Sequence, residues 1–177
     1  MKELHNLYCI VGESGSGKTT IVDKLEEKYG YKVLKSYTTR PPRHDGDTDH
    51  TFVSLEKYGE LQDKVATAEF NGAFYCATAD QVENNDLYVI DCTGIKELKE
   101  KYKGRKNIVV IYIKVPMEER LNRMLHRGDG LDKAWERLRH DYDAFSNVEE
   151  LADYTINGIP DCSWLEVAYI ISVREVL

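Results

Sequence analysis

The clearest candidate for chemistry is a glycine-rich segment, GESGSGKT, that begins at Gly12 and ends at Thr19. Its spacing fits the GxxxxGK[ST] phosphate-binding pattern. Glycines let the backbone wrap closely, so that successive N–H groups point at phosphate oxygens. The lysine of this pattern neutralises the β and γ phosphates, and its threonine hydroxyl holds Mg²⁺. The segment predicts a site for ATP with Mg²⁺, made by Gly12, Glu13, Ser14, Gly15, Ser16, Gly17, Lys18, Thr19 and Thr20.

A second segment, SYTTRPPR, runs from Ser36 to Arg43. It carries two arginines three residues apart on a stretch stiffened by two prolines. Such a pair would make a preset fork for a dianionic phosphate. The ordinary alternative is a pair of exposed arginines that only solvate the surface. We expect a phosphorylated acceptor to sit here, opposite the glycine-rich loop.

The glycine-rich loop has the flanks that its function requires. Leu7 to Val11 is a short apolar run that leads directly into it, as expected of a buried parallel strand. From Thr20 to Tyr29 apolar residues recur at helical spacing, and Gly30 stands where a helix would end. Strand, loop and helix in this order favour a nucleotide site over a plain glycine turn.

The rest of the chain alternates buried strands with helices. Strands are predicted at Leu87 to Asp91, Ile108 to Val115 and Tyr154 to Ile156. Pro116 opens a helix that reaches about His126. The polar stretch RGDGLD then precedes a long helix, and Asp161 is predicted to cap a closing helix. The long helix contains Trp135, Leu138, Tyr142 and Phe145. This alternation predicts an α/β fold with a mostly parallel sheet flanked by helices, the core of a P-loop NTPase.

Residues 36 to 79 break the alternation. They contain short runs rich in Thr, Tyr and Phe around one helix that begins near Ser54. We expect a small insertion of mixed or antiparallel strands. An insertion that faces a parallel core leaves a cleft between the two, which is a usual place for a ligand.

Composition excludes several other classes of protein. The chain has 177 residues, of which 42% are hydrophobic and 31% charged, so it fits one soluble globular domain. A net charge of −7 argues against nucleic acid as the main partner. No apolar run approaches the ~20 residues of a membrane span. The N-terminus predicts a first strand instead of a signal peptide, so we expect a cytoplasmic protein with reduced thiols. The thiols are those of Cys9, Cys76, Cys92 and Cys162.

Several motifs appear in the order in which guanylate kinases carry them. Besides the two segments above, they are FVS at Phe52, AEFNGAFY around Glu69, VID ending at Asp91, RMLHRG and ERL. The sequence resembles the guanylate kinase family over roughly residues 5 to 160. The resemblance implies transfer of a phosphoryl group from ATP with Mg²⁺ to GMP or dGMP. It also implies a core (1–35, 80–125 and 140–177), an NMP-binding insertion (about 36–79) and a helical lid (about 126–139).

The resemblance assigns roles to individual residues. The acceptor and its phosphate would be held by Ser36, Arg40, Arg43, His50 and Tyr75, with His50 in the place of a family tyrosine. Asp91 would order Mg²⁺ through water, together with Thr19. The lid arginines, which would close on ATP and the transferring phosphoryl, are Arg123, Arg127 and Arg137. Asn157 would approach the adenine.

The departures from the family pattern fall on the acceptor base. Ala66 stands where a glutamate normally accepts the guanine N–H groups, and Thr93 where a second carboxylate does so. Ala77 replaces a small hydroxyl residue, unless a one-residue shift recruits Thr78. Each lost charge-assisted bond is worth about 1.5–3 kcal/mol. The acceptor therefore stays open between GMP, another mononucleotide and a sugar phosphate.

A non-catalytic binding module of the same fold is the remaining alternative. Such modules typically lack a working glycine-rich loop. Here Gly17, Lys18 and Thr19 are all present, so the sequence favours an enzyme.

Overall fold

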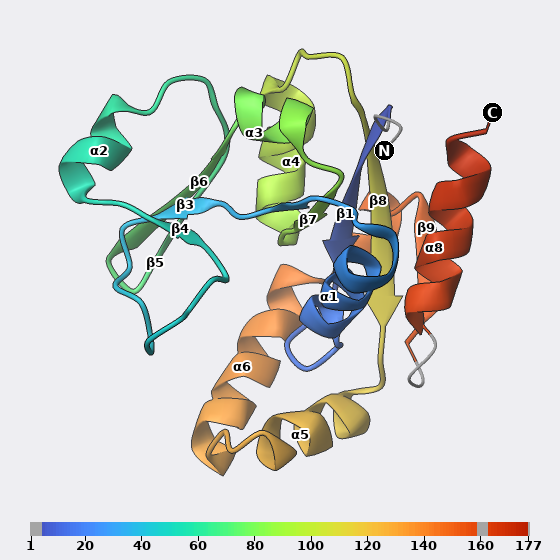
Figure 1. The fold of residues 1–177 in the computed structure, drawn as a ribbon. Helices are drawn as coiled ribbons and strands as arrows, with labels where there is room; N and C mark the ends of the chain where they lie inside the picture. Colours follow the sequence, from blue (N-terminus) through green and yellow to red (C-terminus); the bar gives the residue numbers. More distant parts are fainter. Residues whose placement is uncertain (1–4, 159–162, 177) are drawn as a thin grey trace.

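The computed structural model describes residues 5–158 and 163–176. Its centre is a five-stranded, wholly parallel sheet with the order β2-β7-β1-β8-β9 (Figure 1). The strands are β1 (Asn6–Val11), β2 (Val33–Leu34), β7 (Leu87–Val89), β8 (Asn107–Lys114) and β9 (Tyr154–Asn157). The α/β core with a parallel sheet, predicted from the alternation of strands and helices, is confirmed.

The sheet is buried on both faces because its strands are apolar at nearly every position. Every residue of β1 is buried, and β7 and β8 flank it on either side. Side chains alternate between the faces, so Leu7 and Cys9 belong to one apolar cluster while Tyr8 and Ile10 belong to the other. The glycine-rich loop therefore begins at the end of the central, buried strand of the sheet.

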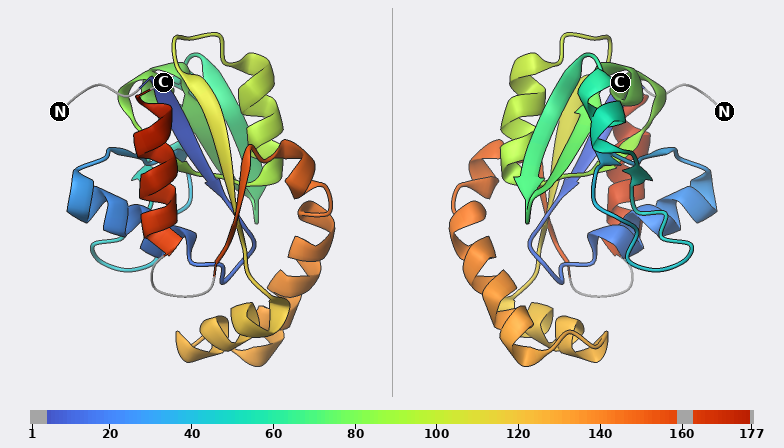
Figure 2. Two further views of the ribbon diagram at one scale, coloured as in Figure 1. Left: turned by 90° about the vertical axis from the view of Figure 1, so that its right-hand side faces the viewer. Right: turned by 90° about the vertical axis from the view of Figure 1, so that its left-hand side faces the viewer.

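Helices cover the two faces of this sheet. On one face α1 (Lys18–Tyr29) and α8 (Ser163–Arg174) lie side by side and close one cluster with Leu25 and Ile171. On the other face lie α3 (Ala79–Asn84), α4 (Cys92–Lys101) and α7 (Val148–Leu151). Figure 2 shows α1 and α8 on the side opposite α4.

A second sheet occupies the middle of the sequence. Its order is β4-β3-β6-β5, and its strands are β3 (Tyr37–Thr38), β4 (Thr51–Phe52), β5 (Lys64–Phe70) and β6 (Ala73–Thr78). The β3–β4 pair is parallel and the other pairs are antiparallel. The short helix α2 (Leu55–Glu60) follows Ser54, whose hydroxyl accepts a hydrogen bond from the Lys57 N–H.

Two helices project from the carboxyl end of β8, below the main sheet in Figure 1. They are α5 (Met117–His126), with Pro116 at its N-cap, and α6 (Leu131–Ala144). A small apolar cluster of Met124, Ala134 and Leu138 holds them together. The turn between them contains Gly128, whose φ of 93° suits glycine. We call α5, the turn 127–130 and α6 the lid helices, because they contain residues 126–139, which the family resemblance predicts to form the lid.

The ends of β7 and α6 differ from the predicted boundaries. The strand expected to reach Asp91 ends at Val89, and Asp91 is instead the N-cap of α4, where its carboxylate accepts a hydrogen bond of 2.7 Å from the Gly94 N–H. Phe145, expected within the long helix, is its C-cap. Asp161 lies outside the described residues, as does Cys162, while Cys9, Cys76 and Cys92 are buried free thiols.

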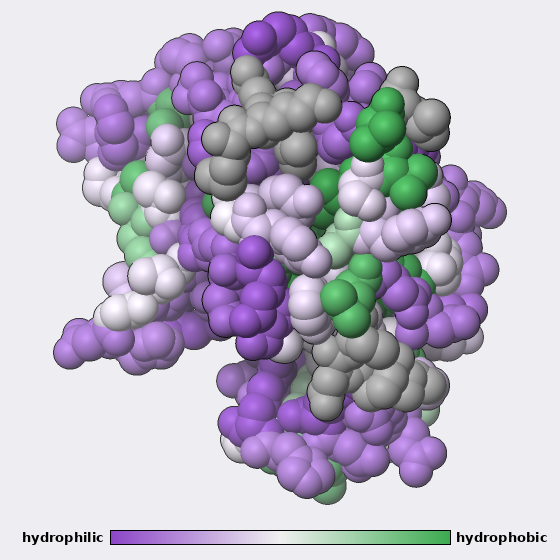
Figure 3. Space-filling view, turned by 45° about the vertical axis from the view of Figure 1, so that its right-hand side comes forward, coloured by the Kyte–Doolittle hydropathy of each residue, from purple (hydrophilic) through white to green (hydrophobic). Residues whose placement is uncertain are grey.

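The face of the molecule seen in Figure 3 is mostly polar. In the space-filling view, isolated apolar residues lie among polar ones, and the molecule is hollowed between the lobe of the second sheet and that of the lid helices (Figure 3). Within the described part of the chain, no helix combines the length and apolar character needed to cross a membrane.

Candidate phosphoryl-transfer site

The glycine-rich loop follows β1 and leads into α1, as predicted. Gly15 and Gly17 have φ values of 80° and 90°, a conformation that favours glycine. A Cβ on Gly15 would stand 2.7 Å from the carbonyl oxygen of Arg120, and one on Gly12 would stand 2.9 Å from the carbonyl oxygen of Ile113. Glycine is therefore required both by conformation and by the close approach of neighbouring backbone.

Lys18 curls back over this loop. Its ammonium donates to the carbonyl oxygens of Gly12 at 2.6 Å and Glu13 at 3.0 Å. Burial lowers the pKa of Lys18 to about 8, against the opposing effect of the Asp141 and Glu13 carboxylates. The ammonium is thus held beside the backbone N–H groups that can receive phosphate oxygens.

A buried charge network ties the loop to the lid helices. The Ser14 N–H donates to an Asp141 carboxylate oxygen at 2.7 Å, and that oxygen lies 3.4 Å from the Arg120 guanidinium. Glu13 lies 3.7 Å from Arg120 on its other side and accepts a hydrogen bond from the Tyr112 hydroxyl. Sequence reasoning missed Arg120 and Asp141, because nothing local marks which of many charged helix residues is buried.

Arg123 also contacts the loop. Its guanidinium donates to the carbonyl oxygens of Ser16 at 3.5 Å and Gly158 at 3.3 Å, and to the Glu119 carboxylate at 2.9 Å. It therefore brings the glycine-rich loop together with the end of β9, where the exposed Asn157 lies. Ser16 and Asn157, both expected to contact ATP, are far apart in the sequence. Arg123 contacts the backbone of Ser16 and of Gly158, the residue that follows Asn157.

In the second sheet, Arg40 is held by an internal partner. Its guanidinium lies 3.2 Å from the Asp47 carboxylate and 5.2 Å from the centre of the Phe52 ring. The backbone N–H of Arg43, with smaller contributions from Asp49 and Arg40, lowers the pKa of Asp47 to about 2. Arg40 Nε is buried and has no hydrogen-bond partner within the described residues.

Ser36, His50 and Tyr75 come together beside Arg40. The Ser36 hydroxyl lies 3.0 Å from His50 Nδ1, and the imidazole meets the Tyr75 ring edge-on with centroids 5.3 Å apart. Burial, followed by the charge of Arg40, lowers the pKa of His50. Both effects favour the neutral imidazole, which shares a hydrogen bond with Ser36.

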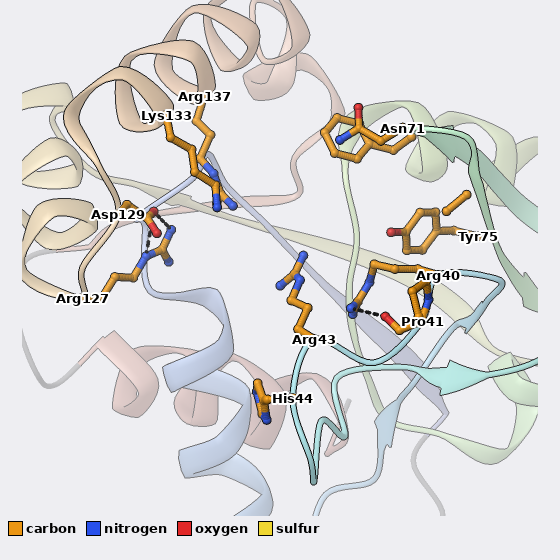
Figure 4. Close-up of a pocket in the computed structure, with 12 residues that line it drawn as sticks. Arg40, Pro41, Arg43, His44, Asn71, Tyr75, Arg127, Asp129, Lys133 and Arg137 are labelled. Carbon is orange, nitrogen blue, oxygen red and sulfur yellow. Dashed lines mark hydrogen bonds and ion pairs between the residues drawn. The ribbon is translucent and has the colours of Figure 1, made fainter.

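A cavity of about 760 Å³ lies between the second sheet and the lid helices. Figure 4 shows arginine side chains from both sides pointing into it. Its lining comprises Arg40, Pro41, Arg43, His44, Phe70, Asn71, Ala73, Tyr75, Arg127, Asp129, Lys133 and Arg137. Five of these side chains are basic and one is a carboxylate, so the cavity is suited to anions. Lys133 was not anticipated from the sequence.

The two positions expected to read guanine through carboxylates carry no charge. Ala66 on β5 pairs directly with Ala77 on β6, and both side chains are buried in the apolar cluster that also contains Cys92. Thr93 is exposed in the first turn of α4. The positions 66 and 77, which the resemblance led us to expect near the acceptor base, are therefore small and apolar.

The residues proposed for Mg²⁺ fit an ion that arrives with ATP. Thr19 is exposed in the first turn of α1, and the Asp91 carboxylate keeps one oxygen outside its helix cap. Among the described residues, no group of three or more His, Cys, Asp or Glu could hold a metal. A hydroxyl with a water-bridged carboxylate suits Mg²⁺, which retains several waters and binds mainly through substrate phosphates.

A parallel α/β core, a glycine-rich loop between a strand and a helix, and a facing cationic cavity together define a P-loop phosphotransferase. The family model described as an AAA domain matches residues 9–149. A guanylate kinase from Chlamydia muridarum is 31% identical over 174 residues, covering 86% of this chain and 80% of the relative. One from Geobacter metallireducens is 34% identical over 139 residues, covering 71% and 66%.

Structural similarity agrees with these matches. The crystal structure of guanylate kinase from Anaplasma phagocytophilum has a TM-score of 0.70 at 23% identity, covering 100% of this chain and 89% of that one. The chain belongs to the guanylate kinase family, and its residues 9–149 also match the AAA domain family. It is thus a nucleotide phosphotransferase, and the family predicted from the motif order is confirmed.

Proposed function

We propose that this protein transfers the γ-phosphoryl group of ATP to GMP or dGMP, releasing ADP and the nucleoside diphosphate. One observation carries the proposal: a cavity lined by cations lies between the second sheet and the lid helices, with residues of the acceptor motif on one side and lid arginines on the other. The relatives, which are named guanylate kinases, support the choice of acceptor.

The position of each group of residues determines its role in binding or catalysis. The glycine-rich loop holds the phosphates of ATP through its backbone N–H groups, and Lys18 moves from the loop carbonyls to the β and γ phosphates. Arg40, Arg43 and Tyr75 hold the acceptor phosphate. Arg127 and Arg137 supply positive charge where negative charge spreads in the transition state.

Thr19, and Asp91 through water, would hold the Mg²⁺ that arrives with ATP, and this ion would supply positive charge against the phosphates. Arg123, which contacts the Ser16 and Gly158 carbonyls, keeps the lid in touch with the nucleotide end of the core. Asn157 would approach the adenine. We assign residues 36–79 to acceptor binding and about 126–139 to the lid, and we place the enzyme in the cytoplasm.

A second acceptor class has one specific observation in its favour. The Ala66–Ala77 pair is buried and apolar, so no carboxylate from these positions meets the N–H groups of guanine. Another mononucleotide or a sugar phosphate would lose nothing there. The retained Arg40 and Arg43 require that any acceptor carry a phosphate.

A coupled ADP-release assay over a panel of mononucleotides and pentose phosphates tests the proposal. We expect turnover that depends on ATP, Mg²⁺ and GMP or dGMP, with Lys18→Ala as the inactive control. Turnover with a different acceptor but not with either guanine nucleotide would reassign the substrate. An absence of both turnover and any thermal shift with Mg-ATP would identify a binding module instead.

A further inference from the structure

The cations of the cavity fall into two groups. Arg40 is paired with Asp47, and Arg127 is paired with Asp129 at 2.7 Å. The side chains of Arg43, Lys133 and Arg137 form no hydrogen bond or ion pair with any residue that the structure describes. The charges of Arg43, Lys133 and Arg137 are therefore available to a ligand, whereas Arg40 and Arg127 already have carboxylate partners.

The three unpaired cations converge on one region. Lys133 and Arg137 are four residues apart on α6, so their side chains project from the same face of that helix (Figure 4). Arg43 reaches toward them from the second sheet across the cavity. Like charges at this spacing repel each other. The Asp129 carboxylate, whose pKa is lowered mainly by Arg127 and less by Arg137 and Lys133, offsets this repulsion only in part, so the arrangement favours a bound anion.

The balance of charge indicates which anion. The lining holds five cations, and the two carboxylates Asp47 and Asp129 engage two of them, which leaves three positive charges. A phosphate group carries roughly two negative charges near neutral pH. Three unpaired cations therefore suit a phosphoryl group in transit beside the acceptor phosphate better than they suit a single carboxylate.

We propose that Lys133 is a further catalytic residue, which contacts the transferring phosphoryl group together with Arg43 and Arg137. This inference rests on the proposed function, because it needs phosphates in the cavity. Lysine meets a phosphate as a compact point charge with three donors, and α6 carries it toward the transfer site with the lid. Neither the sequence motifs nor the comparisons assign this residue a role.

The chain offers a matched control on the same helix. Arg139 is exposed and does not line this cavity, although it lies only two residues from Arg137. Arg139→Gln removes a positive charge from the same helix, α6, but outside this cavity. Lys133→Gln removes one inside the cavity, and Lys133→Arg keeps the charge.

Two measurements decide the role. Calorimetric titration with inorganic tripolyphosphate, carried out in a Lys18→Ala background, reports the affinity of the remaining cations for phosphate. We expect Lys133→Gln to weaken it about tenfold, as for one charge-assisted hydrogen bond, and Arg139→Gln to leave it unchanged. Steady-state kinetics in the wild-type background should show kcat about tenfold lower in Lys133→Gln, with smaller changes in either KM and recovery in Lys133→Arg.

The outcomes separate this inference from the proposed function. If Lys133→Gln stays folded but binds tripolyphosphate and turns over like Arg139→Gln, the role of Lys133 is wrong even though the enzyme phosphorylates GMP. If the unmodified protein does not phosphorylate GMP, the acceptor is wrong, and the titration still decides whether Lys133 binds phosphate. A Lys133→Arg variant as weak as Lys133→Gln would also overturn a role based on charge.

Discussion

The Asp141 carboxylate accepts a hydrogen bond of 2.7 Å from the backbone N–H of Ser14, which joins helix α6 to the glycine-rich loop. The same carboxylate oxygen lies 3.4 Å from the buried guanidinium of Arg120 on α5. One side chain thus connects both lid helices to the loop that is proposed to hold ATP. A movement of the lid helices would therefore change the position of that loop.

Asp141→Ala should therefore lower stability and weaken ATP binding together. Among the described residues, it leaves the Arg120 guanidinium with Glu13 at 3.7 Å as its remaining carboxylate, besides the Val115 carbonyl oxygen at 3.2 Å, and breaking a buried ion pair costs about 3 kcal/mol or more. Urea denaturation measures the change in the free energy of unfolding. Arg120→Met combined with Asp141→Leu should lose less than the sum of the single variants. Additive losses would show that the pair is not coupled.

The pKa of Lys18 predicts an alkaline limit for ATP capture. Burial lowers this pKa to about 8 in the free protein, so the ammonium loses its proton as the pH rises through 8. The value of kcat/KM for ATP, which reports the free enzyme, should fall about tenfold per pH unit above that point. Bound phosphates favour the charged form, so kcat should decline only at higher pH.

A Lys18→Arg variant provides the control for this profile, because arginine stays charged throughout the range. Its remaining activity should show no decline near pH 8. If the decline persists in Lys18→Arg, another group is titrating.

Arg40→Ala should raise the KM for the acceptor by about 100-fold and leave the KM for ATP nearly unchanged. The variant removes a phosphate contact and also takes the guanidinium partner away from the Asp47 carboxylate, which keeps its hydrogen bonds from the backbone N–H groups of Arg43 and Asp49 and would then repel the acceptor phosphate. Arg40→Ala with Asp47→Asn should recover part of the loss. Arg43→Ala, which exposes no buried carboxylate, should have a smaller effect. A dominant change in the KM for ATP would contradict the assignment.

Arg127→Ala or Arg137→Ala should lower kcat by about 100-fold and change either KM less, because lid residues act most strongly in the closed transition state. Arg127 lies on the turn between the lid helices and is held by Asp129, while Arg137 lines the cavity from α6. Rapid-quench measurements under single-turnover conditions separate the chemical step from product release. An unchanged chemical step in both variants would exclude this role.

Discrimination between GMP and AMP should be weak, below about 100-fold in kcat/KM, because Ala66 and Ala77 present no polar group to the base. Ala66→Glu would restore a carboxylate able to accept two guanine N–H groups, but at a buried site. We expect it to lower the melting temperature and to raise the preference for GMP about tenfold. A wild-type preference of several orders of magnitude would mean that other residues read the base.

Local features of the sequence determined the nucleotide site and the fold class. The spacing from Gly12 to Thr19 is a local property, and the apolar strand before it and the helix after it are local too. The order of motifs indicated the family for the same reason, since each motif is read from neighbouring residues. These local patterns can be recognised without knowledge of any long-range contact.

The tertiary structure alone decided which charges are paired. Ser14 and Asp141 are 127 residues apart in the sequence, and no periodicity of α6 distinguishes Asp141 from the charged residues around it. Lys133 and Arg139 are both charged residues of one helix, and only the packing of α6 against α5 places the first in the cavity. Asp91 similarly became a helix cap because α4 begins where β7 ends. Pairing and burial depend on distances between elements, which local sequence patterns do not specify.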